Sequence, residues 1–168
     1  MLVSKLLERM DVRGTYVDAQ AMDVTDDSRR VRKGTVFVCI CGAHFDGHSA
    51  ALQAEENGAV LIVAERDTGA KNQVLVENTR SAYARLCAAF YGYPAEKLHL
   101  IGVTGTNGKT TTTMLLKGIL DRAGIRAGLI GTVENMVGMQ IYPAALTTPD
   151  CQELPRLLSA LVAAGCTH

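Results

Sequence analysis

The stretch LHLIGVTGTNGKTTTTMLLKGILDRA, residues 98–123, joins an apolar run, a glycine-rich turn and a helical pattern. Residues 98–103 have the apolar character of a buried strand. The segment after the turn carries apolar residues at helical spacing that can pack against that strand, namely Met114, Leu115, Ile119 and Leu120. The sequence therefore predicts a strand, a loop and a helix in that order.

The turn has the residues of a phosphate-binding loop. Glycines at 105 and 108 let the backbone approach an oxygen-rich ligand, and the start of the helix adds the positive end of its dipole. Lys109 would reach the outer phosphates as a point charge, and Thr110 would offer its hydroxyl to Mg²⁺. The predicted nucleotide-binding residues are Gly105, Thr106, Asn107, Gly108, Lys109, Thr110 and Thr111.

This loop departs from the pattern G-x-x-x-x-G-K-[ST], because Val103 stands five residues before Gly108. The alternative is an ordinary glycine-rich turn between a strand and a helix. Strand, Gly-Lys-Thr and helix in the required order favour nucleotide binding. A phosphate loop by itself does not identify the reaction.

The composition is that of a soluble globular protein, with 48% apolar and 20% charged residues. Seventeen basic side chains balance seventeen acidic ones, so no global field gathers nucleic acid or an acidic membrane. Residues 1–10 suit an amphipathic helix and not a signal sequence, and no later run is long enough to span a bilayer. We therefore expect a cytoplasmic protein with neither nucleic-acid nor membrane partners.

The cysteines, at 39, 41, 87, 151 and 166, form no C-x-x-C pair. An odd number in a chain expected to be cytosolic indicates reduced thiols, and we interpret them as small core residues. Cys39 and Cys41 could share a strand face, and a zinc site with His44 and His48 is the less favoured alternative.

The chain before residue 92 reads as alternating strands and helices. Strands are predicted at 35–40, 59–64 and 73–76, and helices at 49–57, with Ser49 as its cap, and at 78–90. Residues 35–40 are apolar almost throughout, as in a strand covered on both faces. The loop at 41–48 follows that strand's carboxyl end, where open α/β sheets bind ligands.

Gly92-Tyr93-Pro94 marks a predicted domain boundary, with domains at 1–94 and 95–168. After the predicted helix ends at Gly124, residues 127–133 read as a strand parallel to 98–103, and 134–146 as a looser segment. Thr148 would then cap a last helix that Gly165 ends. The predicted fold is a small α/β domain followed by an incomplete P-loop α/β domain.

Three segments resemble the Mur ligases, ATP-dependent amide-forming enzymes of peptidoglycan precursor synthesis. They are DDSRRVRKGTVFVCICGAHFDGH at 26–48, GVTGTNGKTTT at 102–112 and ALTTPD at 145–150. The resemblance runs from about residue 23 onward. Family members that add the third peptide residue and those that add the terminal dipeptide share the first segment, and the paired threonines resemble the former.

The resemblance implies roles for residues at the matching positions. Gly105–Thr111 would hold ATP, with Lys109 as a catalytic residue and Thr110 as a Mg²⁺ ligand. The substrate contacts would be Ser28, Ala43, His44 and Phe45 for the UDP-sugar and Thr147 and Thr148 for the muramoyl-peptide. Ser28 could otherwise be a turn residue and Thr148 only a helix cap. Phe45 departs from the small or polar residue usual in the family.

The implied reaction adds a diamino acid to UDP-N-acetylmuramoyl-L-alanyl-D-glutamate through an acyl phosphate, in a monomeric enzyme that uses ATP and Mg²⁺. The partners would be that UDP-sugar dipeptide and an amino acid. The family's magnesium carboxylate, carbamylated lysine and C-terminal domain would lie beyond His168, so we expect the chain alone to be inactive. A dipeptide-adding Mur ligase and a non-catalytic nucleotide- or UDP-sugar-binding module stay open as alternatives.

Overall fold

The structure is a computed structural model that describes residues 1–43, 45–138, 140–144 and 146–168. Contacts divide the chain into two compact units, Met1–Phe90 and Tyr91–His168. The first unit contains α1 (Val3–Leu7), β1 (Arg13–Thr15), β2 (Asp23–Thr25), the 3-10 helix η1 (Ser28–Arg30), β3 (Thr35–Val38), the 3-10 helix η2 (Gly47–Ala50), α2 (Ala51–Glu56), β4 (Ala59–Ala64), β5 (Gln73–Leu75) and α3 (Thr79–Phe90). The second contains the 3-10 helix η3 (Pro94–Lys97), α4 (Lys109–Arg122), β6 (Leu129–Ile130), β7 (Glu134–Val137), β8 (Gln140–Pro143) and α5 (Glu153–Ala163).

The first unit is built on a five-stranded sheet with the order β1-β5-β4-β3-β2. Strands β2, β3, β4 and β5 are parallel, and β1 is an antiparallel edge strand beside β5. The predicted strands at 35–40, 59–64 and 73–76 and the helix at 78–90 are confirmed with small changes at their ends. The sequence prediction missed β1 and β2, because each has only three residues and both are largely polar.

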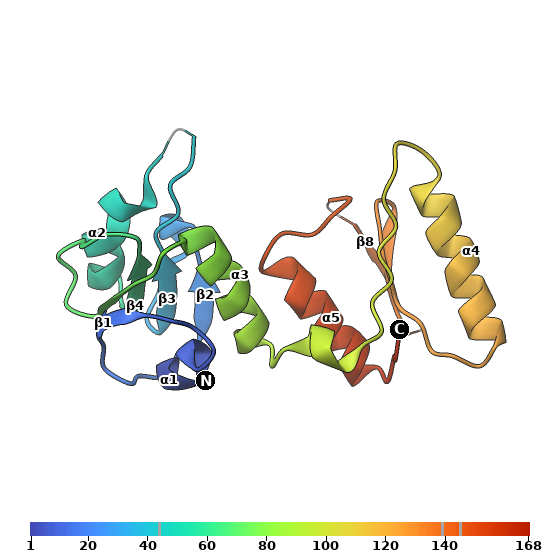
Figure 1. The fold of residues 1–168 in the computed structure, drawn as a ribbon, viewed down its shortest axis with the longest axis horizontal. Coiled ribbons are helices and arrows are strands. Elements are labelled where there is room, and N and C mark those ends of the chain that lie inside the picture. Colours follow the sequence, from blue (N-terminus) through green and yellow to red (C-terminus); the bar gives the residue numbers. More distant parts are fainter. Residues whose placement is uncertain (44, 139, 145) are drawn as a thin grey trace. The chain divides into compact units, whose positions relative to one another are not determined.

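Helices cover both faces of this sheet, as the continuous apolar strands predicted. Phe37 and Ile62 pack in one cluster with Ala51 and Ala54 of α2, whereas α3 contacts β2, β3 and β4. Figure 1 shows the strands between α2 and α3. Phe37 is fully buried, which stabilises the fold by about 1.5–3 kcal/mol relative to an exposed side chain.

The parallel arrangement gathers four connecting segments at one edge of the sheet. The segments after β2, β3, β4 and β5 leave from the carboxyl ends of neighbouring parallel strands. Helix α2 begins after η2, whose cap is Asp46 accepting from the His48 backbone N–H, so the prediction of Ser49 as a cap was wrong. Asp46 is the cap because it lies directly before the first residue of η2, where its carboxylate reaches a free backbone N–H.

In the second unit, the predicted buried strand at 98–103 is not a strand. Leu98 packs in a cluster with Val137, Leu158, Leu161 and Cys166, but Leu100 and Ile101 are 57% and 54% exposed. His99 N–H donates to the Thr167 carbonyl at 2.9 Å, and no strand of the described residues pairs with 100–103. Without neighbours on both sides, this apolar run stays extended and open.

The predictions for residues 127–146 were also wrong in detail. The strand predicted at 127–133 is limited to β6. It pairs antiparallel with β7 and not parallel with 98–103. The segment expected to be loose is the hairpin of β7 and β8. In the view of Figure 1, this hairpin lies between α4 and α5. No residue of α4 is buried, and Leu115 and Ile119 are 64% and 65% exposed, contrary to the predicted packing against 98–103.

Helices α4 and α5 end at the predicted glycines, but α5 does not begin where the sequence predicted. Gly124 and Gly165 have φ of 78° and 74° and end α4 and α5, as predicted. Helix α5 begins at Glu153, where Asp150 accepts from the backbone N–H groups of Gln152 and Glu153. Thr148 therefore does not cap it. Among the residues that the structure describes, no helix has the length and apolar character needed to cross a membrane.

Candidate functional site

The loop before α4 is shaped as an anion nest. Gly105 and Gly108 have φ of 149° and 79°, which side-chain-bearing residues rarely adopt. The backbone N–H groups of residues 105–111 donate to no described residue, and the first intrahelical bond runs from Thr112 N–H to the Gly108 carbonyl. These free donors and the helix dipole together favour an anion at this point.

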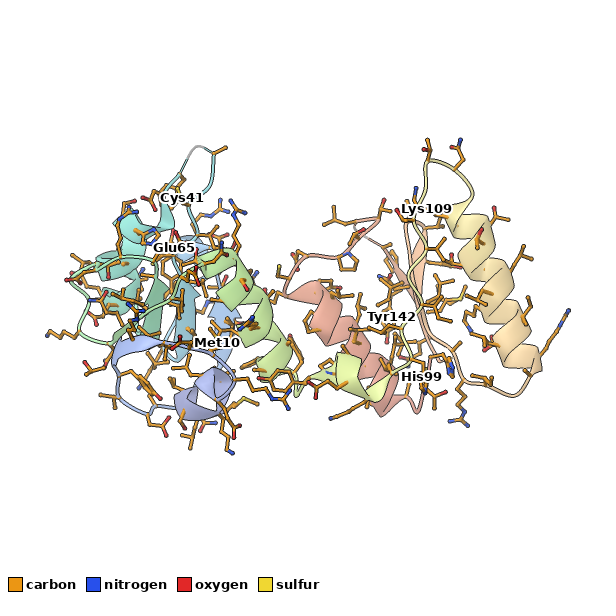
Figure 2. All side chains as sticks on the ribbon, in the orientation of Figure 1. Met10, Cys41, Glu65, His99, Lys109 and Tyr142 are labelled. Atoms are coloured by element: carbon orange, nitrogen blue, oxygen red, sulfur yellow. The ribbon has the colours of Figure 1, made fainter. Side chains whose placement is uncertain are left out.

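Lys109 lies at the first position of α4 and bends back over the loop. Its Nζ donates to the Gly105 carbonyl oxygen at 2.6 Å. Figure 2 shows Lys109 at the loop end of α4, with His99 at the opposite end of the unit. Thr110 is exposed, and its hydroxyl donates to no described residue. A positive charge and a free hydroxyl therefore lie beside the nest.

A cavity of about 580 Å³ extends from this loop through the second unit. Met114 and Leu120 of α4 line its apolar wall together with residues 100–103. At the loop end, Lys109 and Thr110 share the cavity with Thr147 and Thr148, although some forty residues separate the two pairs in the chain. The cavity thus has polar groups at the predicted nucleotide loop and an apolar wall along Met114, Leu120 and residues 100–103.

Thr147 and Thr148 have no structural task that explains them. Both side chains are exposed and form no hydrogen bond to a described residue. Because α5 begins five residues after Thr148 and is capped by Asp150, the alternative reading of Thr148 as a helix cap is excluded. Both hydroxyls are available to a ligand in the cavity.

In the first unit, Ser28 lies in the segment after β2. Its neighbour Asp27 holds the turn, accepting from the Arg29 backbone N–H at 3.0 Å and from the Arg29 guanidinium at 2.8 and 2.9 Å. These hydrogen bonds lower the pKa of Asp27 to about 2. The hydroxyl of Ser28 bonds to no described residue, so the hydrogen bonds of Asp27 and Thr25 account for the turn without it.

The loop between Cys41 and Asp46 follows β3 beside the Ser28 segment; it is named the substrate loop because the sequence predicts that it contacts the substrate. Ala43 and Phe45 are exposed, and His44 lies outside the described residues. The loop closes on itself through Gly42 N–H to the Phe45 carbonyl at 2.8 Å and a bridge between Cys41 and Asp46. Neighbouring parallel strands thus bring Ser28 and the substrate loop to one edge of the sheet.

Sequence reasoning missed the residues that hold this loop. Arg80 of α3 donates to the Cys41 carbonyl at 2.8 Å, and Arg66 pairs with Asp46. The charged pair Glu65-Arg66, directly after an apolar strand, was the signal for the second contact. Arg80 has no comparable signal, because its distance from the loop is set by how α3 packs.

The cysteines are partly as predicted. Cys39, Cys87 and Cys166 are buried, whereas Cys41 and Cys151 are exposed, which corrects the prediction that all five are core residues. Burial raises the pKa of the Cys39 thiol to about 12, so it stays protonated. Within the described ranges, no group of three or more metal-ligating side chains is present. The zinc alternative therefore has no support there.

Two Mur ligase profiles match successive parts of the chain. The profile described as "Mur ligase family, catalytic domain" matches residues 23–91, and "Mur ligase middle domain" matches residues 103–168.

Curated relatives at high identity carry one name, UDP-N-acetylmuramoyl-L-alanyl-D-glutamate–2,6-diaminopimelate ligase. The protein of Geobacillus thermodenitrificans is 47% identical over 154 residues, which cover 91% of this chain and 31% of the relative. That of Bacillus licheniformis is 41% identical over 169 residues, covering 98% and 35%. The chain thus spans about a third of the length of the curated relatives it matches.

Solved structures agree with these relatives. A structure of a ligase of the same name has a TM-score of 0.71 at 25% identity, covering 99% of this chain and 35% of its own. The UDP-N-acetylmuramoylalanyl-D-glutamyl-2,6-diaminopimelate–D-alanyl-D-alanyl ligase from Acinetobacter baumannii, a dipeptide-adding ligase, has a TM-score of 0.53 at 27% identity. The match covers 88% of this chain and 30% of that structure. With profiles, relatives and folds in agreement, the chain belongs to the Mur ligase family.

Proposed function

We propose that residues 1–94 bind the UDP-sugar end of a muramoyl-peptide and that residues 95–168 begin an ATP-binding domain. The observation that carries the second part is the shared cavity, in which Lys109 and Thr110 lie with Thr147 and Thr148. An enzyme that phosphorylates a carboxylate must hold ATP and the acceptor in one site.

In the complete protein, these residues serve an ATP-dependent ligase that joins an amino acid to UDP-N-acetylmuramoyl-L-alanyl-D-glutamate through an acyl phosphate. The names of the relatives support this substrate and 2,6-diaminopimelate as the added amino acid. The lower TM-score of the D-alanyl-D-alanyl ligase makes the dipeptide-adding activity the second candidate.

The chain's own contribution is to place and neutralise negative charge. Carboxylate and γ-phosphate are both anionic, so they approach only where positive groups offset their repulsion. Lys109 and the free N–H groups of residues 105–111 supply such positive groups within one loop. Ser28, the substrate loop, Thr147 and Thr148 bind and orient the acceptor.

Thr110 fits a role as one ligand of a magnesium ion. Its hydroxyl is a hard oxygen donor, exposed in the first turn of α4 beside the nest. Described acidic, histidine and cysteine side chains form no cluster that could complete the coordination. When bound, the ion would supply charge neutralisation between the phosphates.

A chimaera tests the proposal. Residues 1–168 replace the matching third of the Geobacillus thermodenitrificans relative, and phosphate release from ATP is measured. We expect release that requires both UDP-N-acetylmuramoyl-L-alanyl-D-glutamate and 2,6-diaminopimelate. A cooperatively folded chimaera that releases phosphate only with D-alanyl-D-alanine and the tripeptide substrate would favour the second candidate. A folded chimaera without either activity would refute the proposal.

A further inference from the structure

We propose that His48, held between Asp46 and Glu65, positions the substrate loop for its ligand. This inference rests on the proposed function of that loop in UDP-sugar binding. It assigns His48 a positioning role through the loop, with no contact between the imidazole and the ligand.

Of His48, Asp46 and Glu65, only His48 is buried. Its side chain is 3% exposed, against 34% for Asp46. Its Nδ1 lies 2.6 Å from Asp46 Oδ1, and its Nε2 accepts from the Glu65 backbone N–H at 3.0 Å. The imidazole therefore connects the last residue of the substrate loop to the residue directly after β4.

These contacts define which nitrogen carries the proton. Nε2 accepts a hydrogen bond from a backbone N–H, so it carries none, and the proton lies on Nδ1, where it is donated to the Asp46 carboxylate. A neutral ring with one donor and one acceptor satisfies both neighbours.

Asp46 is held by three groups at once. Its Oδ1 accepts from the backbone N–H and the ring of His48, and its Oδ2 pairs with Arg66. These hydrogen bonds keep the pKa of Asp46 well below its usual range. The carboxylate stays charged and fixed at the end of the substrate loop.

Glu65 extends the connection to the start of α3. Its Oε1 accepts from the backbone N–H of Thr79 at 2.8 Å and from the Thr79 hydroxyl at 2.9 Å. Thr79 is 1% exposed. Figure 2 shows Glu65 and Cys41 in the same part of the first unit. The loop after β3, the end of β4 and the start of α3 are thus joined through His48.

The backbone turns tightly at the end of the substrate loop. Gly47 approaches the backbone of Ile40 so closely that a Cβ would lie 2.9 Å from its N and O atoms. A chain that reverses this tightly needs fixed neighbours, and the exposed side chains of Ala43 and Phe45 do not supply them. A loop that is ordered before binding loses less entropy when its ligand arrives.

The test uses the 168-residue chain and three variants of His48. Gln reaches the Nε2 position and can accept from Glu65 N–H, Asn reaches the Nδ1 position and can donate to Asp46, and Ala does neither. Hydrogen exchange is followed at the backbone N–H groups of Glu65, Gly42 and Gly47. Affinity for UDP-N-acetylmuramoyl-L-alanyl-D-glutamate is measured by calorimetry, with Lys97→Ala as a control outside the first unit and outside the cavity lining.

We expect His48→Ala to speed exchange at all three amides and to weaken binding about tenfold, while exchange at Ile62 in β4 is unchanged. His48→Gln should keep the protection of Glu65 N–H, and His48→Asn should lose it. Both should bind more tightly than His48→Ala, and Lys97→Ala should match the wild type.

Unchanged exchange in His48→Ala would overturn the proposal, whether or not affinity falls, because the loop would then be ordered without the ring. Faster exchange with unchanged affinity would overturn the positioning role. If the wild-type chain binds no UDP-sugar, the proposed function fails, and the exchange pattern still decides whether His48 holds the loop.

Discussion

Lys109 donates through Nζ to the carbonyl oxygen of Gly105, four residues earlier, at 2.6 Å. The lysine thereby closes the glycine-rich loop with its own side chain. Its ammonium and the free N–H groups of residues 105–111 belong to the same loop, so positive charge and donors are present together before any anion binds. A phosphate would complete this arrangement.

Replacing Lys109 tests whether the loop binds phosphate or is an ordinary turn. Lys109→Ala should abolish measurable ATP binding by the chain, because the outer phosphates lose their point charge. The melting temperature without nucleotide should stay within a few degrees of the wild type, since a positive charge at a helix start does not stabilise the helix.

The measurement is calorimetric titration with ATP beside thermal unfolding by circular dichroism. Lys97→Ala is the matched control, because Lys97 is exposed in the same unit and its side chain forms no described hydrogen bond or ion pair. Unchanged ATP affinity in Lys109→Ala would remove this lysine from the site.

Gly47, directly after the substrate loop, should tolerate no side chain. Gly47→Ala places a Cβ 2.9 Å from backbone atoms of Ile40 and 3.1 Å from the carbonyl carbon of Cys39, and neither can move aside as a side chain would. We expect a loss of about 1–3 kcal/mol in the free energy of unfolding, measured with urea.

Gly118 is the control for Gly47, because it has open space where a side chain would lie. Gly118 lies within α4, and a Cβ there would meet nothing within 4 Å. Gly118→Ala should stabilise α4 by about 0.5–1 kcal/mol, because alanine loses less backbone entropy in a helix. Equal effects of the two substitutions would contradict the close approach at Gly47.

Acid should weaken the turn that carries Ser28. The pKa of Asp27 is lowered from 3.8 to about 2 by hydrogen bonds from Arg29, so the folded state favours the ionised carboxylate. Its contribution to stability is present above about pH 4 and is lost as the pH falls toward 2. Asp27→Asn keeps an acceptor for the turn but removes this titration.

The slope of unfolding free energy between pH 4 and pH 2 should therefore be shallower in Asp27→Asn than in the wild type. Asp26→Asn, at an exposed neighbour without a described hydrogen bond, should leave that slope unchanged. Identical slopes in all three proteins would show that Asp27 is not linked to folding.

Residues 1–92 should fold without the rest of the chain. All five strands of the parallel-dominated sheet and both covering helices belong to Met1–Phe90, so the core of this unit is complete within that segment. Circular dichroism should show a cooperative unfolding transition. A random-coil spectrum would mean that this core depends on later residues.

Local sequence determined the features that depend on neighbours along the chain. Gly105 and Gly108 specify the nest through their own backbone conformations, and Lys109 lies one position further on. Gly124 and Gly165 end their helices for the same reason. Six consecutive small and apolar residues were sufficient to identify β4.

Features that depend on distant partners were decided by the tertiary structure. The apolar run at 98–103 looks like a buried strand, but a strand exists only where another segment supplies hydrogen bonds, and here the described residues supply them only near His99. Thr148 resembles a helix cap in the sequence, but in the structure Asp150 accepts from the first N–H groups of α5 instead. His48 acquires its position because β3 and β4 are parallel neighbours, which brings Asp46 and Glu65 to one edge of the sheet.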